Sequence, residues 1–166
     1  MVDPVFSIHT NMSASASAVV NAARGIPELP GTHVIDPLHL LVEVSDPSNK
    51  NIVSSVPRSL LELGFRHADI LRFAQEQGMS DETPTVYRYN DAARRAFELA
   101  EVVGIERRQD HYEMVNVSDL ASGIFMSRSA LIEDLMIEMR CSFAPVLDTL
   151  QTPLRARQRF FASIPD

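Results

Sequence analysis

The sequence predicts an all-α protein of about eight helices, arranged as two pseudo-twofold repeats of four. Two stretches about eighty residues apart read as copies of one helical unit, which means two small units that bury their apolar faces against each other. Each copy has a glycine–isoleucine pair, a polar loop and then a capped apolar helix, which begins near Asp36 or Asn116. An alanine-rich helical pattern precedes each glycine, and strand signals are scarce.

The first repeat opens with a helix over residues 13–24, which is serine-rich at its start and ends at Gly25. Asp36 then caps a helix whose first residue is Pro37. Aspartate accepts hydrogen bonds from the free N–H groups at a helix start, and proline at the first position loses none. Residues 38–44 are apolar nearly all round, which predicts a central, buried helix.

The rest of the first repeat is expected to be helical with interruptions. We expect a short helix over residues 49–55, which Val56 and Pro57 interrupt. From Leu60 onward, apolar residues at helical spacing predict further helix up to Gly78.

The second repeat follows the same plan. Asn90 or Asp91 caps an alanine-rich helix, and a charged loop over residues 104–115 follows it. Three residues in that loop, Tyr112, Met114 and Val115, predict a brief extended segment.

Three more helices complete the second repeat. Asn116 or Ser118 begins the second central helix, which runs through Phe125. Apolar residues over 131–139 mark an amphipathic helix, and Pro145 opens a last short one.

These elements define the domain organisation. We expect a flexible lead-in over residues 1–12, a double helical domain over 13–150 (first repeat 13–77, hinge 78–89, second repeat 90–150) and a basic, aromatic tail over 151–166.

Composition limits the classes of function. Hydrophobic residues make up 45% of the 166 residues and charged residues 22%, which suits one soluble globular domain. The net charge of -7 disfavours a general binder of nucleic-acid phosphates. No apolar window is long enough for a transmembrane helix, and the start of the chain lacks the features of a secretory signal, so no membrane partner is expected. The single cysteine, Cys141, allows no internal disulfide, and we expect a cytoplasmic protein.

The order of helix, glycine, short loop and capped Asp-x-x-His-Leu-Leu helix resembles the Clp repeat. Two such repeats form the N-terminal domain of Clp-type AAA+ unfoldases, in which the central helix commonly reads Gly-Thr-Glu-His-Leu-Leu. Here residues 36–41 read Asp-Pro-Leu-His-Leu-Leu, and residues 116–121 read Asn-Val-Ser-Asp-Leu-Ala. The resemblance covers roughly residues 10–150, and the second copy keeps the spacing more than the identities.

The resemblance implies a recognition module for substrates or adaptors of an ATP-driven unfoldase. The chain lacks a phosphate-binding G-x-x-x-x-G-K-[ST] motif, since its only lysine, Lys50, is followed by asparagine. We therefore expect no enzymatic activity, no catalytic residues and no cofactor. The expected role is that of an adaptor, stabiliser or regulator of a Clp-type unfoldase or its protease.

Two departures from the family pattern affect the ligand. Members that bind phosphoarginine carry a glutamate just before the histidine of each copy, and Leu38 and Ser118 stand at those positions here. Asp119 also replaces the histidine of the second copy. We expect no phosphoarginine recognition, because neither position offers a carboxylate for the guanidinium.

Other chemistry-bearing residues fall into no catalytic or metal pattern. His39 is expected in the core, where its ring bonds a nearby backbone group, and no histidine pair has zinc-ligand spacing. Many Ser/His/Asp combinations exist, and nothing in the sequence selects one as a triad.

Two arginine-rich regions are the candidate partner-binding sites. The first surrounds the alanine-rich helix of the second repeat and comprises Arg88, Arg94, Arg95, Arg107 and Arg108. The second, in the tail, comprises Arg155, Arg157, Arg159, Phe160 and Phe161. The first set either covers and solubilises its surface or binds an anionic partner, and the tail either packs on the bundle or docks to a partner. A small helical nucleic-acid-binding regulator that uses the Arg88–Arg108 region is the alternative function.

Overall fold

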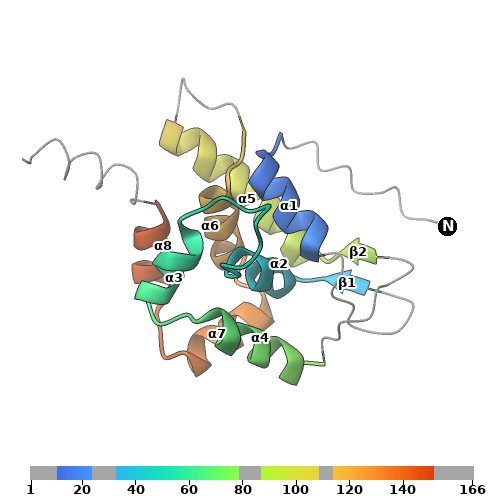
Figure 1. The fold of residues 1–166 in the computed structure, drawn as a ribbon, viewed down its shortest axis with the longest axis vertical. Helices are drawn as coiled ribbons and strands as arrows, with labels where there is room; N and C mark the ends of the chain where they lie inside the picture. The colour runs from blue at the N-terminus through green and yellow to red at the C-terminus, as the bar shows by residue number, and fades with distance from the viewer. Residues whose placement is uncertain (1–10, 24–32, 79–86, 109–113, 152–166) are drawn as a thin grey trace, which may run out of the picture.

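The computed structural model describes residues 11–23, 33–78, 87–108 and 114–151 of the chain (Figure 1). In these four ranges the chain forms eight α-helices and two strands of three residues each. The predicted all-α class is therefore confirmed. None of the helices in these ranges is both long and apolar enough to cross a bilayer.

The helices and strands come in two sets with the same number of helices. The first set comprises α1 (Ala14–Ala23), β1 (His33–Ile35), α2 (Pro37–Val44), α3 (Val56–Glu62) and α4 (His67–Glu76). The second set comprises β2 (Tyr87–Tyr89), α5 (Asp91–Arg108), α6 (Val117–Ser127), α7 (Ala130–Glu138) and α8 (Phe143–Gln151). The helices of the two sets fall within the predicted first and second repeats, apart from the final residue of α8.

Helices α2 and α6 form the centre of the molecule, with the other helices around them (Figure 1). They contact each other, and Leu40, Leu41, Ile124 and Phe125 on them are fully buried. The predicted burial of the helix at residues 38–44 is confirmed, since only Glu43 of α2 is partly exposed. An all-round apolar helix needs neighbours on every side, and α2 contacts α1, α4, α5, α6 and α7.

An extended segment of each half pairs with an extended segment of the other half. Strand β2, which precedes α5, pairs in parallel with β1, which precedes α2, and Tyr89 lies opposite Ile35. Likewise Met12, which precedes α1, forms a parallel bridge with Val115, which precedes α6. The segment before the first helix of each half thus pairs with the segment before the second helix of the other half.

The residues that follow these paired segments, Ser13 and Asn90, make matching hydrogen bonds in the two halves. The N–H of Ser13 donates to the carbonyl of Val115 (2.9 Å), and the N–H of Asn90 donates to the carbonyl of Ile35 (3.1 Å). The side-chain oxygens of Ser13 and Asn90 each accept from the N–H three residues later, at 3.1 and 2.8 Å. The predicted cap at Asn90 is confirmed. The same hydrogen-bond pattern is thus present in both halves.

Helix packing follows the same reciprocity. Helix α1 contacts α6 while α5 contacts α2, and α3 contacts α6 while α7 contacts α2. The first and third helices of each half therefore pack on the second helix of the other half. The two halves share one core and are not separate domains.

Three local expectations need correction. Residues 49–55 form turns and irregular chain, not a helix, and α3 begins at Val56 with Pro57 in its first turn. Proline there costs no hydrogen bond, so the expected interruption is the helix start. Helix α5 also continues through Gly104 to Arg108, where the sequence predicted a loop. An interior glycine costs only about 1 kcal/mol, which tertiary contacts of this turn offset.

The structure also tests the expectations for the extended segment near residue 115 and for the lead-in over residues 1–12. The extended segment expected near residues 112–115 is confirmed at Val115, which forms the bridge described above. The end of the lead-in is tied down, because Val115 donates its N–H to the carbonyl of Asn11 (2.8 Å). Residues 1–10, most of the hinge (79–86) and the tail from residue 152 lie outside the described residues.

Candidate functional site

The two positions that carry the Clp-repeat resemblance are structural caps. Asp36 Oδ1 accepts from the N–H of Leu38 (2.9 Å), and the N–H of Asp36 donates to His39 Nδ1 (2.9 Å). In the second half, the N–H of Asp119 donates to Asn116 Oδ1 (2.9 Å), and the N–H of Asn116 donates to Asp119 Oδ2 (3.0 Å). Both motifs are capping boxes, in which the cap and the third helical residue satisfy each other's backbone N–H.

His39 has the core role that the sequence predicts. Its ring is fully buried, and Nδ1 accepts the backbone bond from Asp36. Among the described residues, no three His, Cys, Asp or Glu side chains converge as ligands for a metal ion.

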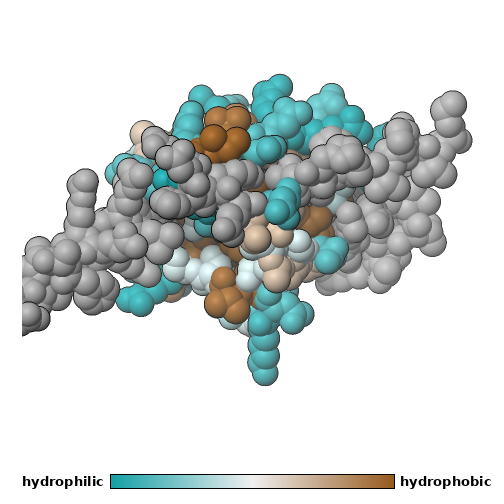
Figure 2. Space-filling view, turned by 90° about the horizontal axis from the view of Figure 1, so that it is seen from above, coloured by the Kyte–Doolittle hydropathy of each residue, from teal (hydrophilic) through white to brown (hydrophobic). Residues whose placement is uncertain are grey.

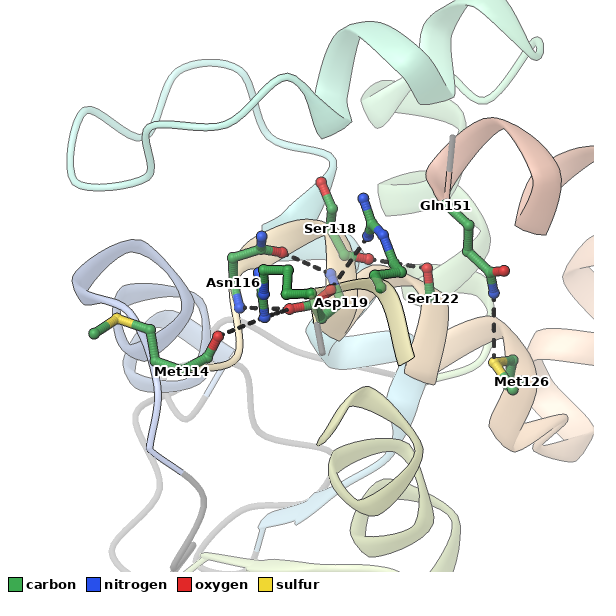
Figure 3. Close-up of polar contacts among 9 residues, drawn as sticks. Met114, Asn116, Ser118, Asp119, Ser122, Met126 and Gln151 are labelled. Carbon is green, nitrogen blue, oxygen red and sulfur yellow. Dashed lines mark hydrogen bonds and ion pairs between the residues drawn. The ribbon is translucent and has the colours of Figure 1, made fainter. Parts of the chain in front are cut away.

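Asp119 contacts several polar groups of the second half. Its carboxylate is fully buried, and it lies 3.2 Å from Arg107 Nη1 and 2.5 Å from Arg108 Nη2. Arg108 Nη2 also donates to the carbonyl of Met114 (2.6 Å). Figure 3 shows the carboxylate at the centre of these contacts, beside Asn116 and Met114. A buried carboxylate requires such partners, so the last turn of α5 is fastened to the first turn of α6.

This arrangement divides the first arginine-rich region. Arg107 and Arg108 are fixed on Asp119, Arg94 is half-buried, and Arg88 and Arg95 are exposed. Arg94 and Arg107 are 13 residues apart on α5, which is about 20 Å along the helix axis at a rise of about 1.5 Å per residue. The five arginines therefore do not form one continuous patch. The tail residues, Arg155, Arg157, Arg159, Phe160 and Phe161, lie outside the described residues.

Asp36 also connects the two halves. Its Oδ2 accepts from Asn90 Nδ2 (2.8 Å), and its Oδ1 accepts from the hydroxyl of Ser129 (3.2 Å) at the start of α7. Ser129 in turn caps α7 by accepting from the N–H of Ile132 (3.2 Å). One carboxylate thus holds the starts of α2, α5 and α7 together.

A Ser/His/Asp cluster lies at the carboxyl end of α2. Ser45 Oγ lies 3.0 Å from His67 Nδ1, and His67 Nε2 lies 4.0 Å from Asp46 Oδ1. The Ser45 hydroxyl donates its proton to the carbonyl of Val42 (2.9 Å) and is almost fully buried. A nucleophilic serine must be exposed and give its proton to the histidine, so this cluster ties α2 to α4 and does not form a triad.

The pKa values of two carboxyl groups near this cluster are shifted in opposite directions. Burial, and secondarily the charge of Asp46, raises the pKa of Glu43 to about 7. Burial alone would also raise the pKa of Asp46, but hydrogen bonds from Ser48 and the nearby His67 outweigh it and hold the pKa below its ordinary value.

Each half carries an open pocket beside its third helix. The pocket of the first half, about 500 Å³, lies between the end of α2, α3 and the start of α4. The pocket of the second half, about 470 Å³, lies between α7 and the start of α8. An exposed apolar side chain lines each one, Leu61 in the first and Ile137 in the second.

The sequence alone does not reveal these pockets. The signal was present in the repeat itself, since the same number of residues separates Leu61 from Ile137 and Gly64 from Arg140. The repeat alone does not show which apolar positions stay exposed, because that depends on packing between the halves.

No family model matches the sequence, and a comparison with curated proteins gives no match either.

Proposed function

We propose that this chain is a non-enzymatic protein-interaction module made of two Clp-repeat-like units. It acts as an adaptor, stabiliser or regulator of a Clp-type AAA+ unfoldase or its protease. Such a partner would place it in the cytoplasm.

The observation that carries the proposal is the reciprocal assembly of the two units. Each unit has a capping box at its second helix, and each lends an extended segment to the other unit. Two like units of four helices are what the resemblance of residues 36–41 and 116–121 to the Clp repeat implies.

The polar side chains of the described core support a contact role over a catalytic one. His39 and Asp119 complete capping boxes, and Ser45 donates its proton to a backbone carbonyl. Each of these groups already serves the fold, while the exposed features repeated in both units are pockets with apolar and arginine side chains. Pockets of this kind suit the docking of a partner.

The nucleic-acid alternative finds less support in the geometry. Arg107 and Arg108 neutralise Asp119, so the Arg88–Arg108 region presents fewer charges to phosphate groups than the sequence suggests. The net charge of -7 opposes the approach of a polyanion.

Direct binding measurements test the proposal. The purified chain is titrated with the Clp-type unfoldase hexamer from its own organism, and in parallel with duplex DNA and single-stranded RNA, over a range of salt concentrations. We expect saturable binding to the unfoldase with a shallow salt dependence. Binding to nucleic acid that weakens steeply with salt, together with no binding to the unfoldase, would favour the alternative.

A further inference from the structure

The two pockets are equivalent sites in the two units. In both, the turn after the third helix has the same backbone bond: Phe65 donates to the carbonyl of Leu60 (2.8 Å), and Cys141 donates to that of Met136 (3.1 Å). The residue before each donor has positive φ, at 91° for Gly64 and 53° for Arg140. A helix end closed this way fixes the direction of the next helix, so both units build the same concave corner.

Each corner exposes one aliphatic side chain at the matching position. Leu61 is 55% exposed and Ile137 is 75% exposed, whereas the neighbouring Leu60 and Met136 are buried in the core. A repeated exposed aliphatic side chain inside a pocket is unusual for a surface, where single apolar residues are normally scattered. Figure 2 shows that scattered pattern on the face seen from above, where small apolar groups lie among hydrophilic residues.

Arginines flank the aliphatic side chain in both pockets. The first pocket is lined by Arg58 and Arg66, and the second by Arg128 and Arg140. One arginine of each pair is held in place, Arg58 by Glu62 (3.4 Å) and Arg128 by Glu133 (3.2 Å) and the ring of Phe143.

The second arginine of each pair is exposed. Among the described residues, Arg66 and Arg140 form no ion pair. Each pocket therefore offers an accessible guanidinium beside an apolar contact.

We infer that the two pockets are twin docking sites for a peptide segment that carries an aspartate or glutamate next to an aliphatic or aromatic residue. The apolar residue of the segment would cover Leu61 or Ile137, and its carboxylate would pair with Arg66 or Arg140. This inference rests on the proposed function and names the chemistry of the partner. A segment with one or two carboxylates fits better than a polyanion, because the chain as a whole carries a charge of -7.

Two equivalent sites predict two binding events per chain. A partner with two such segments would bind far more tightly than a single segment, provided its linker spans both pockets. The two pockets share no lining residue, so we expect each to hold its own segment.

The test is a titration of the isotopically labelled full chain, followed by NMR shift mapping. The probe is the capped peptide Ser-Asp-Leu-Phe-Glu-Gly, with the neutral Ser-Asn-Leu-Phe-Gln-Gly and the acidic, non-apolar Ser-Asp-Ser-Ser-Glu-Gly as matched controls. We expect saturable shifts centred on residues 58–67 and 128–143, and binding of each control weaker by about tenfold.

Variants assign each site. Arg66→Gln should abolish the shifts at residues 58–67 only, and Arg140→Gln those at residues 128–143 only. Arg95→Gln, which changes an exposed arginine outside both pockets, should change neither set. All three side chains are exposed, so the variants should fold.

Equal binding of the neutral peptide, or shifts that do not centre on either pocket, would overturn the inference. The unfoldase titration separates the two proposals. If the unfoldase binds and the acidic peptide does not, the twin-site inference fails alone; if the peptide binds and the unfoldase does not, the proposed function fails alone.

Discussion

At the scale of single residues, Asp119 shows how the second capping box differs from the first. The second Clp-repeat-like copy has aspartate where the first has His39, yet both side chains accept the backbone N–H of their cap residue. Aspartate is charged, and its burial requires cationic partners, which Arg107 and Arg108 supply from the end of α5. From the sequence, these arginines either cover their surface or bind an anionic partner, because the sequence does not show that α5 extends to reach Asp119.

Replacing Asp119 with alanine should therefore destabilise the fold strongly. The substitution removes one half of a capping box and leaves two partly buried arginines without their carboxylate, a loss of about 3–5 kcal/mol. Urea denaturation of Asp119→Ala measures it, with Asp134→Ala on the exposed face of α7 as control, for which we expect a change within about 0.5 kcal/mol. Similar midpoints for the two variants would show that the arginine–carboxylate cluster is not structural.

Glu43 should make stability depend on pH. Its pKa is about 7 in the folded chain against an ordinary value of 4.5, so between these values the folded state holds a proton that the unfolded state has released. The contribution of Glu43 to the free energy of unfolding is therefore greatest below the lower value and declines as pH rises through the higher one. Glu43→Gln should abolish this decline.

The measurement is the urea midpoint at about pH 5 and about pH 8. Glu43→Gln should raise the midpoint more at the higher pH, whereas the exposed control Glu138→Gln should shift it little at either. An equal effect of Glu43→Gln at both pH values would contradict the raised pKa.

At the scale of helices and strands, sequence pattern predicted the central pair more securely than the connections. The all-round apolar pattern of residues 38–44 and the caps at Asp36 and Asn116 are local features, and local chemistry determines them. The strands β1 and β2 are too short to show a period in the sequence, and their pairing depends on segments far apart in the chain. The start of α3 was also mispredicted, because Pro57 lies in the first turn of the helix and in the sequence looks like a helix break.

Leu41 should be essential to α2. Its side chain is fully buried between the helices that surround α2, and truncation of a buried leucine to alanine typically costs about 2–5 kcal/mol. The matched control is Leu61→Ala on α3, where the side chain is half exposed and the loss should be well under that range. A denaturant midpoint that Leu41→Ala leaves unchanged would mean that α2 is not the centre of the core.

Gly123 should be needed for the close approach of α5 and α6. A Cβ at this position would lie 2.2 Å from the carbonyl oxygen of Ala96 and 2.9 Å from the N of Ala100, both backbone atoms. In an isolated helix alanine is favoured over glycine by about 1 kcal/mol, but here Gly123→Ala should destabilise by roughly 1–3 kcal/mol or more.

Thermal unfolding of Gly123→Ala, alone and combined with Ala100→Gly, shows which contact causes the loss of stability. Ala100→Gly removes the side-chain contact at 3.0 Å but leaves the Ala96 carbonyl in place, so it should not rescue Gly123→Ala. A stabilising effect of Gly123→Ala would show that α5 and α6 can move apart without cost.

At the scale of the whole molecule, the main feature is the reciprocal pairing of the two halves. Each half takes an extended segment and two packing helices from the other, so neither half would keep its core alone. The repeat in the sequence predicted two like units. It did not predict the exchange of segments, which depends on contacts between the halves, or the twin pockets, which depend on how the third and fourth helices pack within each half.

The central claim, that this two-unit module acts on a Clp-type unfoldase, is tested most directly by its effect on proteolysis. The measurement is the rate of ATP-dependent degradation of an unfolded fluorescent reporter by the unfoldase–protease of the same organism, as the chain is titrated in. We expect the rate to rise or fall and then to saturate at micromolar concentrations of the chain, with Asp119→Ala less effective because its fold is weakened. An unchanged rate at large excess of the folded chain would contradict the claim.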